Sequence, residues 1–129
     1  MITSPYDKYR QSSVQTSSPA QLLLMMYDGA IRFCKVAIEG MNSVDYTKVN
    51  TNLGKAQTIV SELVTTLDRS YDVSKSLDSL YEYINYLLIQ ANIKKIKEPI
   101  EEAVGYLLEL RQTFAQAATM TGGQDNQHG

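Results

Sequence analysis

The chain has 129 residues, a formal net charge of −2, a hydrophobic fraction of 43% and a charged fraction of 20%. This composition is ordinary for one soluble globular domain, and the balanced charge excludes a general attraction to nucleic acid or anionic lipid. The longest apolar run, Leu22 to Tyr27, has six residues, which excludes a membrane span of ~20 residues and hence stable membrane insertion.

Residues 1–17 form an N-terminal arm that lacks the basic-then-apolar layout of a signal peptide. Cys34 is the single cysteine, so no intramolecular disulfide can form, in agreement with a cytoplasmic protein. Tyr6 and Tyr9 each combine an apolar ring with a hydroxyl, which suits them to cover an apolar groove. We expect the arm to occupy part of a partner site in the free protein and to be displaced on binding. A disordered arm without a role is the alternative.

The segment from Pro19 to Met41 is predicted to be a helix, because Ser18 and Gln21 can form a capping box and Pro19 suits the first helical position. Its charges occupy an arc of roughly 60° on a helical wheel, whereas about 260° is almost wholly apolar and a core stripe needs only ~100°. The residues in excess are Leu22, Met25, Phe33 and Val36. A binding partner would cover them; a central position of this helix, or a dimer, would do the same.

Three further segments repeat apolar residues at alternating spacings of three and four, which is typical of packed helices and not of strands. They extend from Tyr46 to Leu67, from Val73 to Ala91 and from Ile96 to Ala117. The connections of about three to six residues force neighbouring helices to be antiparallel.

Residues at the predicted helix starts agree with these limits. Asp45 can cap the second helix, Asp72 or Ser74 the third, and Pro99 suits the first turn of the fourth. We therefore predict an all-α, antiparallel up-down-up-down four-helix bundle over residues 18–118, between the N-terminal arm and a disordered tail at 119–129.

One face of the second helix carries small uncharged side chains, where Lys and Glu would be better helix formers. These residues are Thr47, Thr51, Gly54, Thr58, Ser61 and Thr65. Such a row makes a shallow groove in which a partner helix can lie; a tolerant solvent-exposed face is the alternative.

On the third helix, Tyr86, Ile89 and Ile93 point away from the predicted core and are flanked by Tyr83. A contiguous set of exposed apolar side chains indicates an interface. Together the three surfaces favour a long partner segment that wraps around several faces and folds on binding.

The residues that familiar catalysts require are missing. The single histidine, His128, lies in the predicted tail, so the inward Glu-x-x-His pairs of a di-iron bundle cannot form. The sequence has no phosphate-binding loop and no Cys/His spacing for a metal. We therefore expect no enzyme activity, no metal and no cofactor.

Four stretches carry a family resemblance: Tyr6-x-x-Tyr9, Ser17-Ser18-Pro19 leading to Leu24-Met25-Met26-Tyr27-Asp28-Gly29-Ala30, Asn52-Leu53-Gly54-Lys55-Ala56-Gln57, and Leu80-Tyr81-Glu82-Tyr83 ahead of Ala91-Asn92. In this order and spacing the chain resembles the flagellin-specific export chaperones of the FliS family. Members often carry a tryptophan late in the last helix, where this chain has Phe114.

The resemblance implies a cytoplasmic bundle that binds the C-terminal segment of flagellin, prevents its polymerisation and delivers it to the flagellar export apparatus without ATP or metal. It carries over Tyr27, Asn52, Lys55 and Gln57 as motif positions, of which Tyr27 lies at the centre of the core stripe. A structural homodimer whose apolar faces bury one another is the alternative from another class.

Overall fold

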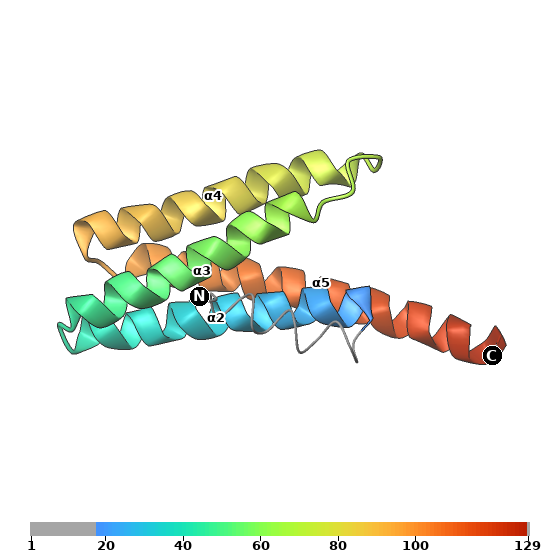
Figure 1. Ribbon diagram of the computed structural model, residues 1–129, viewed down its shortest axis with the longest axis horizontal. Helices are drawn as coiled ribbons and strands as arrows, with labels where there is room; N and C mark the ends of the chain where they lie inside the picture. The colour runs from blue at the N-terminus through green and yellow to red at the C-terminus, as the bar shows by residue number, and fades with distance from the viewer. Residues whose placement is uncertain (1–17, 129) are drawn as a thin grey trace, which may run out of the picture.

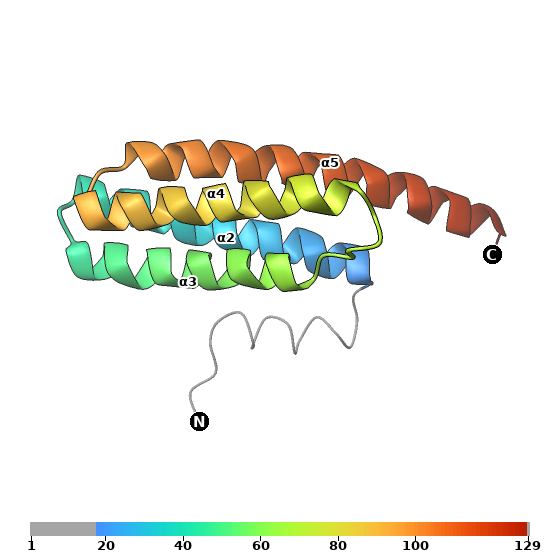
Figure 2. The same cartoon turned by 90° about the horizontal axis from the view of Figure 1, so that it is seen from above.

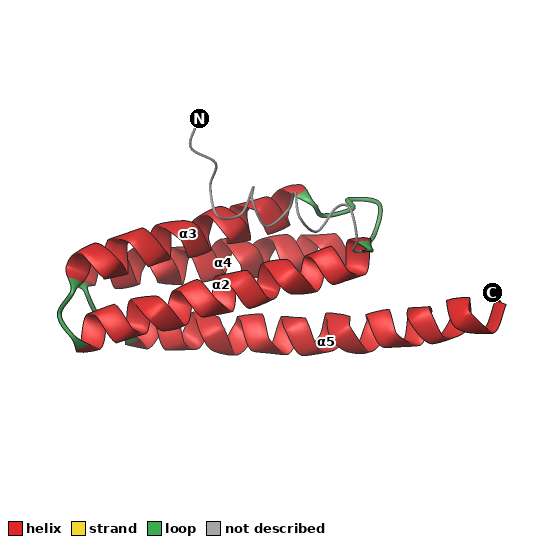
Figure 3. Cartoon of the chain, turned by 60° about the horizontal axis from the view of Figure 1, so that its bottom comes forward, coloured by secondary structure: helices red, strands yellow, loops and turns green. Residues whose placement is uncertain are grey.

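The computed structural model describes residues 18–128, with side chains described up to Thr119. This part of the chain consists of α2 (Pro19–Asn42), α3 (Tyr46–Thr65), α4 (Val73–Lys94) and α5 (Glu98–His128). The helices run alternately up and down and are joined by short loops, as Figures 1 and 3 show. The predicted all-α bundle is confirmed.

Each helix packs against two neighbours, so the bundle has four sides. α2 contacts α3 and α5, and α4 contacts the same two helices from the opposite side. The α2–α3 and α4–α5 connections lie at one end of the bundle, whereas the α3–α4 connection meets the start of α2 at the other end (Figure 2).

The start of α2 is stabilised as its sequence predicts. The Ser18 hydroxyl accepts a hydrogen bond from the Gln21 amide at 3.2 Å, and the Ser18 amide donates to Gln21 Oε1 at 3.1 Å. Asp45 caps α3 in the predicted way, because its Oδ1 accepts from the Lys48 amide at 3.1 Å. Pro99 is the second residue of α5, where its missing N–H leaves no intrahelical bond unmade.

The side-chain cap predicted for the third helix is wrong for both candidates. Asp72 occupies the N-cap position of α4 but makes no side-chain cap bond, because its backbone is helical rather than extended (φ −59°, ψ −35°). Ser74 lies inside the helix and is buried. Backbone bonds from the amides of Ser74 and Lys75 to the carbonyls of Tyr71 and Asp72 tighten the first turn instead.

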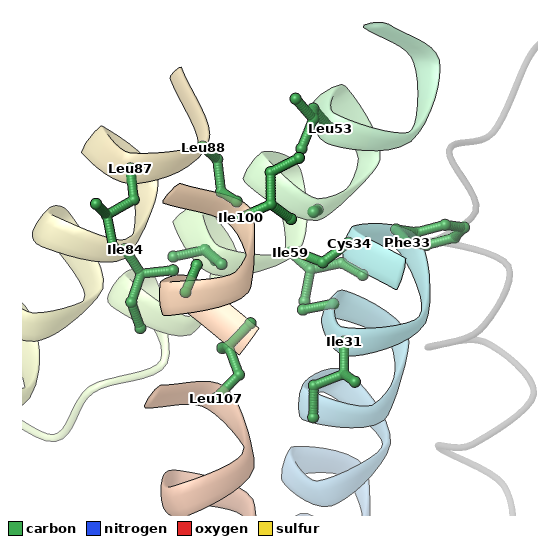
Figure 4. Close-up of a cluster of buried hydrophobic side chains, with 14 of the residues drawn as sticks. Ile31, Phe33, Cys34, Leu53, Ile59, Ile84, Leu87, Leu88, Ile100 and Leu107 are labelled. Carbon is green, nitrogen blue, oxygen red and sulfur yellow. The ribbon is translucent and has the colours of Figure 1, made fainter. Parts of the chain in front are cut away.

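The core draws side chains from all four helices (Figure 4). Most of the predicted seam is buried, but Tyr46, Val73 and Ile96 at its ends are 44%, 60% and 40% exposed. On α4 the buried face includes two pairs of residues that lie side by side on the helix, since Tyr81, Ile84, Leu87 and Leu88 are all buried. The breadth of this face follows from packing against α3 and α5 at once.

α5 continues as a helix to His128, through the segment 119–129 that the sequence predicts to be disordered. In Figure 1 this end of α5 extends beyond the other three helices. Between Ala115 and Thr119 no side chain is fully buried, so tertiary packing does not explain the continuation. Extending an existing helix adds one hydrogen bond per residue and requires no new nucleus.

Replacing Gly40 by alanine is expected to destabilise the bundle by about 1–3 kcal/mol. A Cβ on Gly40 would lie 2.9 Å from Val49 Cγ2, 3.1 Å from the Asp45 carbonyl oxygen and 3.2 Å from the Val49 amide nitrogen, and two of these are backbone atoms that cannot move aside. Urea denaturation would measure the loss. Gly105→Ala is the control, because a Cβ there meets nothing within 4 Å. Equal stabilities for the two variants would contradict the tight approach of α2 and α3.

Candidate functional site

One face of α4 exposes four large side chains next to one another. Tyr83, Tyr86, Ile89 and Ile93 are 41%, 54%, 43% and 70% exposed, and their spacing of three or four residues places them on one side of the helix. We call this set the α4 apolar face. Its exposure agrees with the sequence-based expectation.

Tyr83 is held in place by its neighbours. Its ring stacks on Tyr86 with the centroids 6.1 Å apart and meets the edge of Tyr106 on α5 at 6.0 Å. The hydroxyls of Tyr83 and Tyr106 both donate to Glu102 Oε2, at 2.8 and 3.2 Å. These bonds to a carboxylate raise the pKa of both tyrosines, so the hydroxyls remain protonated donors. The α4 apolar face therefore presents a preorganised aromatic border.

The small residues predicted to line the outer side of the second helix are all exposed in α3; they are Thr47, Thr51, Gly54, Thr58, Ser61 and Thr65. We call them the α3 small-residue face. The Thr58 hydroxyl donates to the Gly54 carbonyl at 3.0 Å, and the Thr65 hydroxyl donates to the Glu62 carbonyl at 2.8 Å. Because these hydroxyls are satisfied within the helix, the face is less polar than its composition suggests.

A groove joins the two faces. It is an open, shallow depression of about 380 Å³ lined by Ser61 and Val64 of α3 and by Glu82, Asn85, Tyr86 and Ile89 of α4. Asn85 Nδ2 donates to Ser61 Oγ at 3.2 Å, and this hydrogen bond connects α4 to α3 within the groove. Residues that the sequence assigns to two separate surfaces thus form one continuous surface. Ser61 and Ile89, which both line it, are 28 residues apart along the chain.

The apolar excess predicted for the first helix is partly covered in the structure. Nine residues of α2 are buried, among them Phe33 and Gly29. The Phe33 ring is 8% exposed and lies 4.9 Å from the Arg32 guanidinium carbon and 5.3 Å from Lys55 Nζ. Phe33 is therefore not openly exposed in this structure.

The other residues predicted on that face, Leu22, Met25 and Val36, are half-buried. A Cβ on Gly29 would lie 3.2 Å from Ile59 Cδ1, so the close approach that this glycine permits is to α3. The sequence could not separate these residues from a docking face, because a wheel shows apolarity and not the neighbour that covers it.

The motif positions from the family resemblance have different surroundings. Tyr27 is fully buried, and its hydroxyl shares a hydrogen bond with the Tyr81 hydroxyl. Asn52 and Lys55 are half-buried, and Asn52 Nδ2 donates to the Lys48 carbonyl of its own helix at 2.8 Å. Tyr27 thus has a structural role, whereas Lys55 reaches the surface beside Phe33. Tyr6 and Tyr9 lie outside the described residues.

Groups suited to catalysis or metal binding do not gather in the described part of the chain. No three His, Cys, Asp or Glu residues there lie close enough together to hold a metal ion. Cys34 is enclosed by the core, and burial raises the pKa of its thiol to about 12, which leaves it protonated and unreactive at neutral pH. No helix among the described residues is long and apolar enough to cross a membrane.

Comparison with known proteins matches the chain to a family. The family model described as "Flagellar protein FliS" matches residues 2–121. The flagellar secretion chaperone FliS of Bacillus subtilis (strain 168) is 39% identical over 116 residues, which cover 90% of this chain and 87% of the relative.

More distant relatives carry the same name. The flagellar secretion chaperone FliS of Salmonella typhimurium is 29% identical over 119 residues, covering 90% of this chain and 88% of its own length. The Campylobacter jejuni protein of that name is 30% identical over 113 residues, which cover 86% of this chain and 88% of the relative. The helical bundle described above accordingly acts as a chaperone and not as an enzyme. The chain belongs to the FliS family of flagellar secretion chaperones.

Proposed function

We propose that this chaperone binds the C-terminal segment of flagellin in the cytoplasm, prevents its premature polymerisation and delivers it to the flagellar export apparatus. The observation that carries the proposal is the α4 apolar face, whose four large side chains are 41–70% exposed in a protein that belongs to a secretion chaperone family. Contiguous exposed apolar side chains bordered by polar ones are typical of a protein-binding surface.

The surface suits an amphipathic partner helix. Tyr86 and Ile89 line the groove between α3 and α4 and would contact apolar side chains of such a helix. The α3 small-residue face, with Gly54 near its centre, lets a second backbone come close. A cargo segment that covers both faces has its own apolar residues buried, and those residues are then unavailable for assembly into a filament.

Calorimetric titration with the C-terminal ~50 residues of flagellin tests the proposal, because burial of apolar surface gives a large negative heat-capacity change. We expect a one-to-one complex with that signature. Absence of heat and of a complex at tens of micromolar would contradict flagellin binding. Sedimentation of the free protein as a stable dimer that covers the α4 apolar face would favour the structural homodimer instead.

Gly54→Ala is expected to stabilise the free bundle by about 0.5–1 kcal/mol and to weaken flagellin binding about tenfold. Nothing lies within 4 Å of a Cβ at Gly54, so the methyl group costs the fold nothing but stands between the two backbones in the complex. Gly105→Ala on α5 is the matched control, with equally open surroundings and unchanged binding expected. Normal binding by Gly54→Ala would remove the α3 small-residue face from the cargo site.

A further inference from the structure

A second cavity lies at the end of the bundle where the α3–α4 connection meets the start of α2, the end opposite the α2–α3 turn in Figure 2. Its volume is about 380 Å³, within the range of sites that hold small ligands. The walls come from α2, α4, α5 and the connection after α3; their apolar members include Leu22, Leu23, Met26, Leu67, Leu77 and Phe114. The α4 apolar face contributes none of these residues.

The back of this end cavity is a fixed aromatic wall. Tyr81 lines the cavity, and its hydroxyl shares a hydrogen bond with the hydroxyl of Tyr27. The Tyr27 ring stacks on Phe114 with the centroids 5.8 Å apart and the planes 17° from parallel. Because both tyrosines are buried in the core, the wall is preorganised and does not need to rearrange when a ligand enters.

Three polar side chains interrupt the apolar lining: Thr66 and Asp68 are exposed, whereas Ser74 is buried. Ser74 is 4% exposed and lines the end cavity, yet no hydrogen bond to its hydroxyl is formed by the residues that the structure describes. The Ser74 oxygen is not among the enclosed side-chain atoms that lack a partner in the described residues, so it opens to the cavity. A hydroxyl can both donate and accept, and this one is therefore available to a polar group of a ligand in the cavity.

We propose that the end cavity binds a neutral aromatic group with one hydrogen-bonding substituent, of the phenol or indole class, and that the Ser74 hydroxyl pairs with that substituent. The rings of Tyr81 and Phe114 and the thioether of Met26 favour an aromatic body. The apolar walls oppose a charged ligand, and Asp68 at the cavity opposes an anion in particular. A purely hydrocarbon ligand would leave Ser74 unpaired. The inference does not depend on flagellin as the cargo.

Titration of the full chain with p-cresol and with toluene tests the proposal, since the two probes differ only in the hydroxyl group. Binding is followed by NMR of the methionine methyl groups, with Met26 at the cavity and Met41 at the far end of α2 as reporters. We expect both probes to shift the Met26 methyl and not that of Met41, with p-cresol binding about three- to tenfold more tightly. No shift at Met26, or equal affinities, would overturn the proposal.

Ser74→Ala is expected to abolish the preference for p-cresol while the weaker binding of toluene remains. Ser76→Ala is the matched control, because Ser76 is exposed on the same helix and does not line the end cavity. A preference that persists in Ser74→Ala would contradict the assigned pairing. Leu22→Trp provides a second variant, which fills the cavity from its half-buried rim; undiminished binding of both probes would place them elsewhere.

The natural source of the aromatic group is either a side chain of a protein partner or a free small molecule. Repeating the p-cresol titration in the presence of saturating flagellin segment distinguishes the two. Loss of p-cresol binding identifies a cargo side chain as the occupant, whereas simultaneous binding identifies a site separate from the cargo. A chain that binds p-cresol but no flagellin would keep this inference and reject the proposed function.

Discussion

Raising the pH from 8 to 11 is expected to reduce the free energy of unfolding by on the order of 5 kcal/mol. The effect comes from three core groups, Cys34, Tyr27 and Tyr81, which are 0%, 0% and 1% exposed. Burial raises the pKa of the Cys34 thiol from 9.0 to about 12. Burial also raises the pKa of both tyrosines above their usual 10.0, and for Tyr27 the hydrogen bond with Tyr81 adds to the rise.

The direction follows from proton binding in the two states. In the unfolded chain the thiol loses its proton above pH 9.0 and the phenols lose theirs above 10.0, whereas in the fold burial raises the pKa of Cys34 and Tyr27 enough to keep both protonated, and the raised pKa of Tyr81 acts in the same direction. The folded state thus binds more protons, so stability falls by about 1.4 kcal/mol per pH unit for each group once its ordinary pKa is passed. The total by pH 11 is comparable to the ~5–15 kcal/mol that stabilise a typical domain.

Urea denaturation followed by far-UV circular dichroism at a series of pH values would measure this loss. Cys34→Ala is the informative control, because without the thiol the decline should begin near the ordinary pKa of tyrosine, about one unit higher. A free energy of unfolding that stays constant between pH 8 and 11 would contradict the burial of these three groups.

The double variant Tyr86→Glu, Ile89→Glu is expected to weaken flagellin binding by at least about 100-fold while the bundle remains folded. Both side chains lie in the middle of the α4 apolar face and line the groove to α3. In the complex the two carboxylates would be buried without partners, which costs far more than the lost apolar contact. In the free protein they remain in water, since the native residues are 54% and 43% exposed.

Calorimetry with the flagellin segment and thermal unfolding of the free variant are the two measurements. Leu108→Glu is the matched control, because Leu108 is 46% exposed but belongs to α5 and lies outside the α4 apolar face. Similar affinities for the double variant and the control would show that cargo binds elsewhere. Phe33→Glu is unsuited to this purpose, because Phe33 is 8% exposed and its replacement would disturb the fold itself.

The sequence by itself determined what depends on local chemistry. The Ser18–Gln21 capping box, the Asp45 cap and Pro99 mark where helices begin, and the structure has them there. The spacing of apolar residues identified four helices in alternating direction. It also identified the exposed side chains of α3 and α4, because the sequence of a helix determines which of its faces is polar, small or apolar.

Tertiary structure decided everything that depends on a neighbouring helix. Phe33 and Val36 look equivalent on a wheel, yet α2 has a buried Phe33 and a half-buried Val36. The groove from Ser61 to Ile89 and the end cavity at Ser74 each combine residues from different helices, and Tyr81 of α4 is buried where its hydroxyl meets that of Tyr27 on α2. The periodicity of apolar residues along one helix indicates how much of its apolar surface must be covered. Only the packing of the helices determines which element covers that surface and which part of it remains exposed.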